Sequence, residues 1–177
     1  MAMTLITTNT SSGAATSDFT SGIDSTYKLY IFTFHNINPV SSSALTFQAN
    51  AAGASGYNET MTTTKFQIDH PENDATTDLS YVAGGDQAQG TAFQSVGQSI
   101  GTGSDQSGAG KLFLFNPSST TYVKHFYSIM PIHYGDTGNA SCTYIGGYIN
   151  TTTAIDDIQF KMSTGNFDGT IKMYGVG

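Results

Sequence analysis

The sequence predicts an all-β fold, a single jelly-roll-like antiparallel β-sandwich of about eight strands, and three observations lead to it. The 177 residues are rich in Thr, Ser, Gly and Asn and contain no Trp. Short runs of β-branched and aromatic residues alternate with clusters of Gly, Asn, Asp and Ser, which is typical of strands and turns. No window of about 11–18 residues repeats its apolar positions with the period of an amphipathic helix.

The expected elements follow one another along the chain. Residues 1–20 are Thr- and Ser-rich, and we expect an extended N-terminal arm or an edge strand there, ahead of a sandwich over residues 21–177. Residues 84–110 show little pattern, and a loop of this length is usually functional or held by a partner. The expected strands cover residues 27–35, 44–49, 61–68, 79–82, 91–96, 111–115, 121–129, 140–149, 155–162 and 170–176.

Two of these strands carry further information. The turn at residues 116–119 contains Pro117 and joins its neighbours into a hairpin, which we expect to end before Pro131. The strand at 27–35 is apolar on both faces, so we expect an opposite sheet on one side and a loop or a neighbouring subunit on the other. The residues that we expect at an oligomer or partner interface are Tyr30, Phe32, Phe34, Tyr122 and His125.

The charge pattern excludes some partners. The net charge is −7, and all six basic residues are lysines, so nucleic acid and anionic membrane surfaces are disfavoured. The lysines fall within expected strands, where outward ammonium groups discourage edge pairing. Neither a secretory signal nor an apolar stretch of about 18 residues is present in the sequence, and the single cysteine, Cys142, is expected to be a buried, inert thiol.

The titratable residues form no recognisable catalytic constellation. His35, His70, His125 and His133 lack zinc-type spacing, and the last two would lie about 26 Å apart on one strand. The adjacent carboxylates Asp156 and Asp157 point to opposite faces of a strand and cannot flank one glycosidic bond. We therefore expect no catalytic residue, no cofactor and no metal site. A polysaccharide depolymerase that uses Asp156 or Glu72 stays open as the enzymatic alternative.

Aromatic residues are the one signal of binding. The chain holds 10 Tyr and 11 Phe, and core packing explains most of them. Five tyrosines lie near expected loops or glycine pairs, where their rings could stack on sugars or on a partner protein: Tyr57, Tyr81, Tyr134, Tyr144 and Tyr148. Of these, Tyr57, Tyr81 and Tyr134 are the candidates to face a ligand.

Five segments resemble a known group of proteins. They are LFNPSSTTYVKHF at 114–126, AIDDIQFKM at 154–162, GTIKMYG at 169–175, DFTSGID at 18–24 and DQAQGT at 86–91. As a set they resemble small virion structural proteins of marine tailed bacteriophages, of the cyanophage and pelagiphage type, over nearly the whole chain. The resemblance implies a virion component on the head or tail exterior, assembled in the host cytoplasm and released by lysis. It implies no catalytic residues.

The resemblance and the residues together favour a capsid decoration protein, a cement or head-fibre protein that stabilises or decorates the particle. Its expected partners are copies of itself, as a homotrimer by analogy with other phage appendages, and the major capsid protein or another virion protein. The alternative is a tail-fibre or receptor-binding jelly roll that binds a host surface glycan through the loop aromatics.

Overall fold

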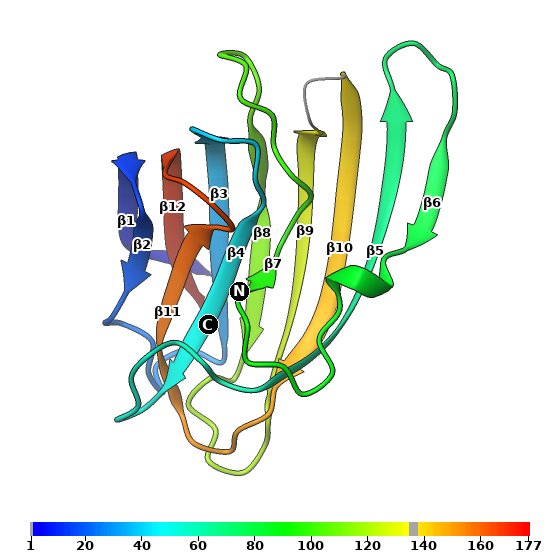
Figure 1. The fold of residues 1–177 in the computed structure, drawn as a ribbon. Coiled ribbons are helices and arrows are strands. Elements are labelled where there is room, and N and C mark those ends of the chain that lie inside the picture. Colours follow the sequence, from blue (N-terminus) through cyan, green and yellow to red (C-terminus); the bar gives the residue numbers. More distant parts are fainter. Residues whose placement is uncertain (1, 135–137) are drawn as a thin grey trace.

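Two antiparallel sheets make up most of the computed structural model, which describes residues 2–134 and 138–177 (Figure 1). The large sheet has the order β1 (Met3–Ala14), β12 (Phe167–Val176), β3 (Leu29–Pro39), β8 (Gly108–Phe115), β9 (Lys124–Tyr134), β10 (Asn139–Ile149), β5 (Met61–Pro71) and β6 (Asp78–Tyr81). The small sheet has the order β2 (Thr16–Phe19), β11 (Ile155–Met162), β4 (Leu45–Ala51) and β7 (Gln94–Ser95). The predicted all-β antiparallel sandwich is therefore confirmed.

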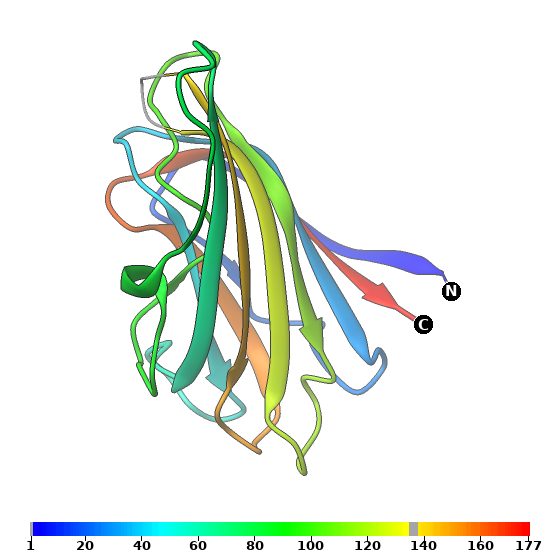
Figure 2. The same ribbon diagram turned by 90° about the vertical axis from the view of Figure 1, so that its right-hand side faces the viewer.

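The described residues form twelve strands where the sequence indicated about eight. Residues 3–14, for which an arm and an edge strand were both open, form β1, which pairs with β12 over most of its length. The N-terminal segment thus belongs to the large sheet, and Met1 lies outside the described residues. Figure 2 shows the two layers edge-on, with the ends of β1 and β12 extending away from the small sheet.

The core lies between the two sheets and is aromatic at its centre. The Phe160 ring of β11 lies 5.3 Å from the rings of Phe32 and Phe34 on β3 and 6.0 Å from that of Phe19. Such edge-on and tilted contacts stabilise a core beyond the area that the rings bury. Strand alternation explains the arrangement, because buried Ile158, Phe160 and Met162 alternate with half-buried residues along β11.

The expected interface role of Tyr30, Phe32 and Phe34 is wrong. Their side chains are 0%, 0% and 1% exposed, because the small sheet covers this face of β3. The second apolar face of β3 is the outer one, where Ile31 is 9% exposed between the strands on either side. Neighbouring side chains of the same sheet therefore cover this face, without a loop or a second subunit.

Pro131 does not end its strand. β9 runs on to Tyr134, and the pairing of β8 with β9 is interrupted between Lys111 and Gly108, opposite the proline. Pro131 lacks a backbone N–H, so it fits a central strand where one neighbouring ladder is already broken.

The long segment between β6 and β8 is part of the core. It covers the inner face of β9, β10 and β5, where the small sheet does not reach, and it buries Val96 and Ile100 completely. Two buried glutamines hold it. Gln94 accepts a hydrogen bond from Thr63 at 2.8 Å, and Gln48 donates to the carbonyls of Thr91 and Ala92. Contacts within the chain therefore anchor this segment.

Two lysines of the large sheet point inward. Lys65 and Lys124 are 4% and 0% exposed, whereas the sequence suggested outward lysines on every strand. Lys124 donates to the carbonyl oxygens of Tyr122 and Thr151 at 2.9 and 3.0 Å, while the Lys65 ammonium has only long contacts, at 3.5 Å to Ser95 and 3.4 Å to Gly97. Burial lowers the pKa of both ammonium groups.

These two lysines should respond oppositely to the same substitution. Lys124→Met is expected to cost about 1–3 kcal/mol, since two buried carbonyls lose their donor. Lys65→Met is expected to stabilise by about 1 kcal/mol, because it removes a desolvated charge with weak partners.

The pKa of the Lys65 ammonium in the folded chain lies below its ordinary value of 10.5, so the unfolded chain binds more protons between the two values. The free energy of unfolding therefore rises with pH up to 10.5. Urea unfolding at pH 7 and pH 10 should show a smaller rise in Lys65→Met than in the parent chain, and an equal rise would contradict this role.

Candidate functional site

The outer face of the large sheet carries a continuous group of exposed and half-buried aromatic and aliphatic side chains over β8, β9, β10, β5 and β6. We name it the aromatic face. Its members alternate along each strand with the buried residues that point into the core. They are Phe66, Ile68, Leu79, Tyr81, Phe113, Phe115, Tyr127, Ile129, Tyr144 and Tyr148.

Ring pairs across neighbouring strands order the aromatic face. Phe66 of β5 stacks on Tyr144 of β10, with centroids 4.8 Å apart and planes within 3°. Tyr127 of β9 stacks on Phe113 of β8 at 4.4 Å and 14°, and Phe115 lies 5.9 Å from the same tyrosine ring. These contacts follow from the register, because directly opposed residues in antiparallel strands have Cβ atoms about 5 Å apart. The rings form two raised ridges with fixed positions.

Glycines open hollows beside these ridges. Gly146 lies on β10 between Tyr127 of β9 and Thr64 of β5, and a methyl group added to it would meet no atom within 4 Å. One hollow beside it is lined by Thr62, Thr64, His125 and Tyr148 among others, and a second by Phe66, Tyr127 and Tyr144. A third hollow lies at Gly110, between Phe113, Ile129 and Pro131.

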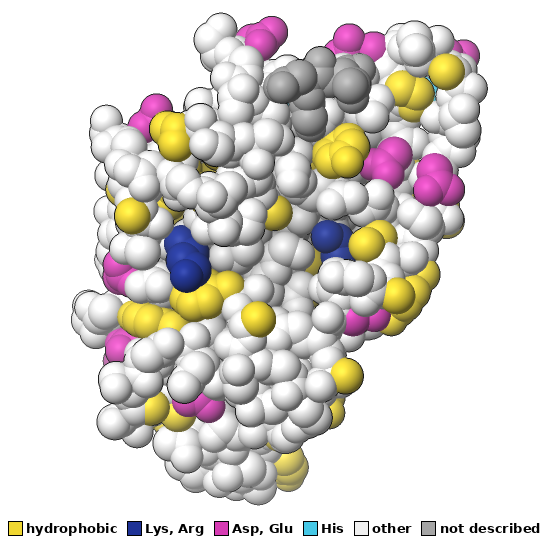
Figure 3. All heavy atoms as spheres, viewed as in Figure 1, with side chains coloured by type: hydrophobic (Ala, Val, Ile, Leu, Met, Phe, Trp, Pro, Cys, Tyr) yellow, Lys and Arg dark blue, Asp and Glu magenta, His cyan; other side chains and the backbone are white. Residues whose placement is uncertain are grey.

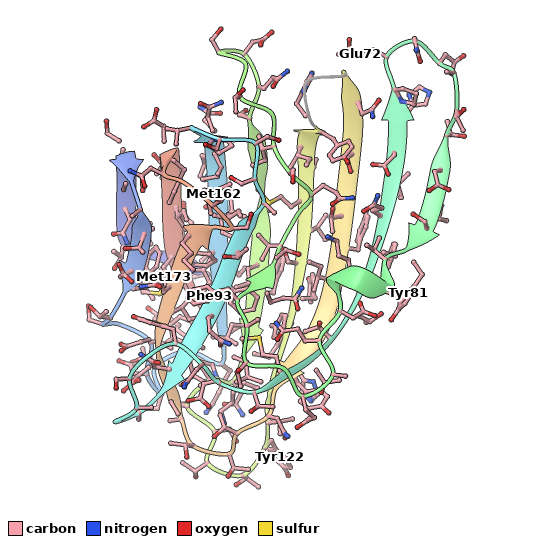
Figure 4. The ribbon with its side chains drawn as sticks, in the orientation of Figure 1. Glu72, Tyr81, Phe93, Tyr122, Met162 and Met173 are labelled. Carbon is pink, nitrogen blue, oxygen red and sulfur yellow. The ribbon has the colours of Figure 1, made fainter. Side chains whose placement is uncertain are left out.

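The sequence-predicted site residues fall into separate places. His125 is exposed on the aromatic face, with its ring edge-on to Tyr148 at 6.1 Å, and Tyr81 lies on the same face, 63% exposed. Tyr122 is 70% exposed in the β8–β9 connection, at the opposite end of the molecule from Glu72 (Figure 4). Tyr57 is half-buried in the β4–β5 loop, and Tyr134 is half-buried against the core. The structure therefore does not assemble the three predicted ligand-facing tyrosines into one site.

Polar groups at the rim distinguish the two ends of the aromatic face. Lys111 lies at the β8 end, in the same register row as Ile129 and Tyr144. At the β6 end the Tyr81 hydroxyl donates to the Asp86 carboxylate, and this bond raises the pKa of the tyrosine. One end of the face is thus basic and the other acidic.

The side that carries the small sheet has a different surface. Figure 3 shows it as mostly backbone and uncharged polar side chains, with scattered apolar groups and acidic residues towards the upper end. The Lys161 ammonium lies 4.0 Å from the centroid of the Phe93 ring, which fixes the segment before β7 over this sheet (Figure 4). The apolar surface that could bind a partner is therefore on the large sheet.

Two histidines lie beside an acid, His70 beside Asp74 and His133 beside Glu72 with 3.7 Å between Nε2 and Oε1, but the four histidines do not gather in one place. His35 shares a hydrogen bond with Thr33 at 2.8 Å, and His70 lies 3.1 Å from Asp74 in an exposed pair. Among residues 2–134 and 138–177, no group of three or more His, Cys, Asp or Glu side chains is placed to hold a metal ion. No helix in the described part of the chain is long and apolar enough to cross a membrane.

Comparison with known proteins adds little. No family model matches the chain, and no curated protein matches it. Among solved structures, a Bacteroides ovatus protein of unknown function aligns with 57% of this chain and 44% of its own length, at 7% identity and a TM-score of 0.31. The aligned part of this chain thus spans less than half the length of that protein, and a likeness this weak carries no argument about fold or function.

Proposed function

We propose that the chain is a structural protein of a tailed-phage particle, displayed on the particle exterior, and that it works by binding other protein subunits and not by catalysis. The observation that carries the proposal is the aromatic face. Exposed Phe, Tyr, Leu and Ile side chains in one continuous patch are what protein interfaces enrich. The resemblance of five sequence segments to virion structural proteins supplies the setting, with a decoration role on the head as the first placement.

The test uses particles that lack the chain. Deleting its gene from a phage that encodes it should leave particles to which the purified, labelled protein rebinds saturably. Tyr127→Lys should weaken this binding at least tenfold, because a charge would be buried at the centre of the contact, at a cost of well over about 1.4 kcal/mol. Val40→Lys is the matched control, since that valine is 60% exposed and lies in the β3–β4 connection, outside the aromatic face.

Three outcomes would count against the proposal or narrow it. Absence of the chain from gradient-purified parent particles would contradict a virion role. Equal rebinding by both lysine variants would contradict the aromatic face as the binding surface. Cryo-electron microscopy of the rebound particles fixes the location, and density confined to the tail tip would replace the decoration role by a tail-fibre role.

A glycan-binding role in a tail fibre is the second candidate. The hollow beside Gly146 combines the Tyr148 ring with hydroxyl groups of Thr62 and Thr64 and with His125. An aromatic platform with adjacent hydrogen-bonding groups is a chemistry that suits a sugar ring. Binding to a glycan array that Tyr148→Ala abolishes would favour this role, whereas no glycan signal and no block of host adsorption by the purified protein would exclude it.

A further inference from the structure

The size of the aromatic face suits a protein partner of ordinary interface area. Leu79, Tyr81, Phe66, Ile68 and Tyr127 are 68%, 63%, 43%, 42% and 38% exposed. At about 200 Å² for a large side chain, these five alone expose roughly 500 Å². This is close to the largest patch of a typical monomer, and a stable interface needs about 800 Å² from each partner. The neighbouring half-buried rings supply further area.

The patch is ordered in rows that cross the strands, with β10 in the middle. One row runs Lys111, Ile129, Tyr144, Phe66 and Tyr81, from β8 to β6. The next row, nearer the Gly146 hollow, runs Phe113, Tyr127, Gly146 and Thr64. On the other side, Pro131, Cys142, Ile68 and Leu79 form a third row. In the second row the large Tyr127 on one side of β10 therefore corresponds to the small Thr64 on the other. In the first row the apolar Ile129 corresponds to Phe66, and the basic Lys111 corresponds to Tyr81.

From this arrangement we infer that the aromatic face binds a second copy of this chain, in an isologous dimer whose two-fold axis runs along β10. The inference rests on the proposed function of this face as a protein-binding surface and names the subunit bound there, a second copy of this chain, so that the dimer is the form that attaches to the particle. A two-fold axis that lies in the interface and runs parallel to the strands places the same row of the two copies face to face. Within that row it exchanges the two sides of β10. Each residue then faces the partner's residue from the opposite side of β10 in the same row.

The contacts that follow are complementary. Tyr127 projects over the partner's Thr64, beside the hollow at Gly146. Leu79 of one copy lies opposite β8 of the other copy, at the hollow beside that copy's Gly110. Tyr81, which carries Asp86 on its hydroxyl, meets the partner's Lys111, so the acidic end of one copy faces the basic end of the other. A two-fold axis across the strands would instead place like ends together, so the charges favour the axis along β10.

The decisive variant fills a hollow without disturbing the monomer. Gly146 needs no left-handed backbone and has open space at its Cβ position, so valine fits the strand and occupies the hollow. In sedimentation analysis the parent chain should form a dimer, and Gly146→Val should raise the dimer dissociation constant at least tenfold while its thermal unfolding stays unchanged or moves up. Val40→Lys should dimerise like the parent chain, as the control outside the face.

Cys142 reports the axis directly. It is half-buried on the outer face of β10, in the third row, and not fully buried as the sequence suggested. The two copies of this thiol therefore face each other at roughly the 10 Å spacing of packed sheets. A short bismaleimide should link the parent chain into covalent dimers and Gly146→Val into few. Linking that is equal in the two proteins, a trimer in sedimentation, or a monomer at every concentration would each overturn the dimer. A chain that stays monomeric and still rebinds to particles through Tyr127 would overturn the dimer but leave the proposed function intact.

Discussion

Phe160→Ala is expected to lower the free energy of unfolding by about 3–5 kcal/mol, as truncation of a buried phenylalanine does when the site cannot collapse. Phe160 is fully buried, and its ring contacts Phe19, Phe32 and Phe34 and lies 6.3 Å from the ring of Phe47. These neighbours come from three strands, β2, β3 and β4, in both sheets, so one truncation loosens the whole junction. Equilibrium denaturation in urea measures the loss.

Phe66→Ala is the matched control for this loss. Its ring is 43% exposed and stacks on Tyr144, so its removal should cost only about 1 kcal/mol. Losses of similar size in the two variants would show that the apolar centre of the fold does not lie between the sheets at Phe160.

Gly147→Ala should destabilise the protein by about 2–4 kcal/mol, although it adds a single methyl group. A Cβ atom at Gly147 would lie 2.5 Å from the carbonyl oxygen of Thr62 and 3.0 Å from the Cα of Thr63. Both obstacles are backbone atoms of β5, so relief requires β5 to separate from β10. Thermal unfolding of the purified variant measures the effect.

The adjacent glycine supplies the control. Gly146 points to the opposite face of β10 and meets nothing within 4 Å, so Gly146→Ala should be neutral or stabilise by about 0.5–1 kcal/mol through the unfolded state. Equal destabilisation by the two alanines would mean that backbone flexibility, and not the close approach of β5, is what this glycine pair provides.

The sequence predicted the strands well, because alternation of apolar and polar residues is a local property. The strand expected at 155–162 matches β11, and the strand expected at 140–149 starts one residue later than β10. Local patterns could not decide which face of β3 points inward, since Tyr30, Phe32 and Phe34 alternate with Leu29 and Ile31 and both sets are apolar. The partner sheet makes that choice, and sheet order depends on contacts between residues far apart in the chain.

The aromatic face was missed for a similar reason. Tyr127, Tyr144 and Phe66 lie on three strands, and only the register of β9, β10 and β5 brings them together. A signal was nevertheless present, because His125, Tyr127 and Ile129 alternate with buried Phe126, Ser128 and Met130 along one strand. Two apolar faces on a strand indicate a second contact surface. The sequence predicted that surface on the strand at 27–35, whereas the exposed apolar face lies on β9 and its neighbours.

The long segment between β6 and β8 shows a further limit. Its composition resembles that of a surface loop, yet Gln94 accepts a hydrogen bond from the Thr63 side chain of β5, and Gln48 of β4 donates to two backbone carbonyls of the segment. Glutamine carries no pattern that distinguishes such a buried anchor from an exposed residue, so this part of the core could not be recognised in advance.

The uneven filling of the interior divides the large sheet into a tight half and a looser half. Under β12 and β3 the interior is built from interlocked rings. Under β10 and β5 it contains the Lys65 ammonium, which has long contacts, and the Ser141 and Thr143 hydroxyl groups, which have no hydrogen-bond partner among the described residues. Regions with fewer apolar contacts open locally at lower free energy than the rest of a fold. Local unfolding is therefore expected mainly in β10 and β5, which carry much of the aromatic face. A subunit bound to that face would suppress unfolding of the least stable part of the molecule.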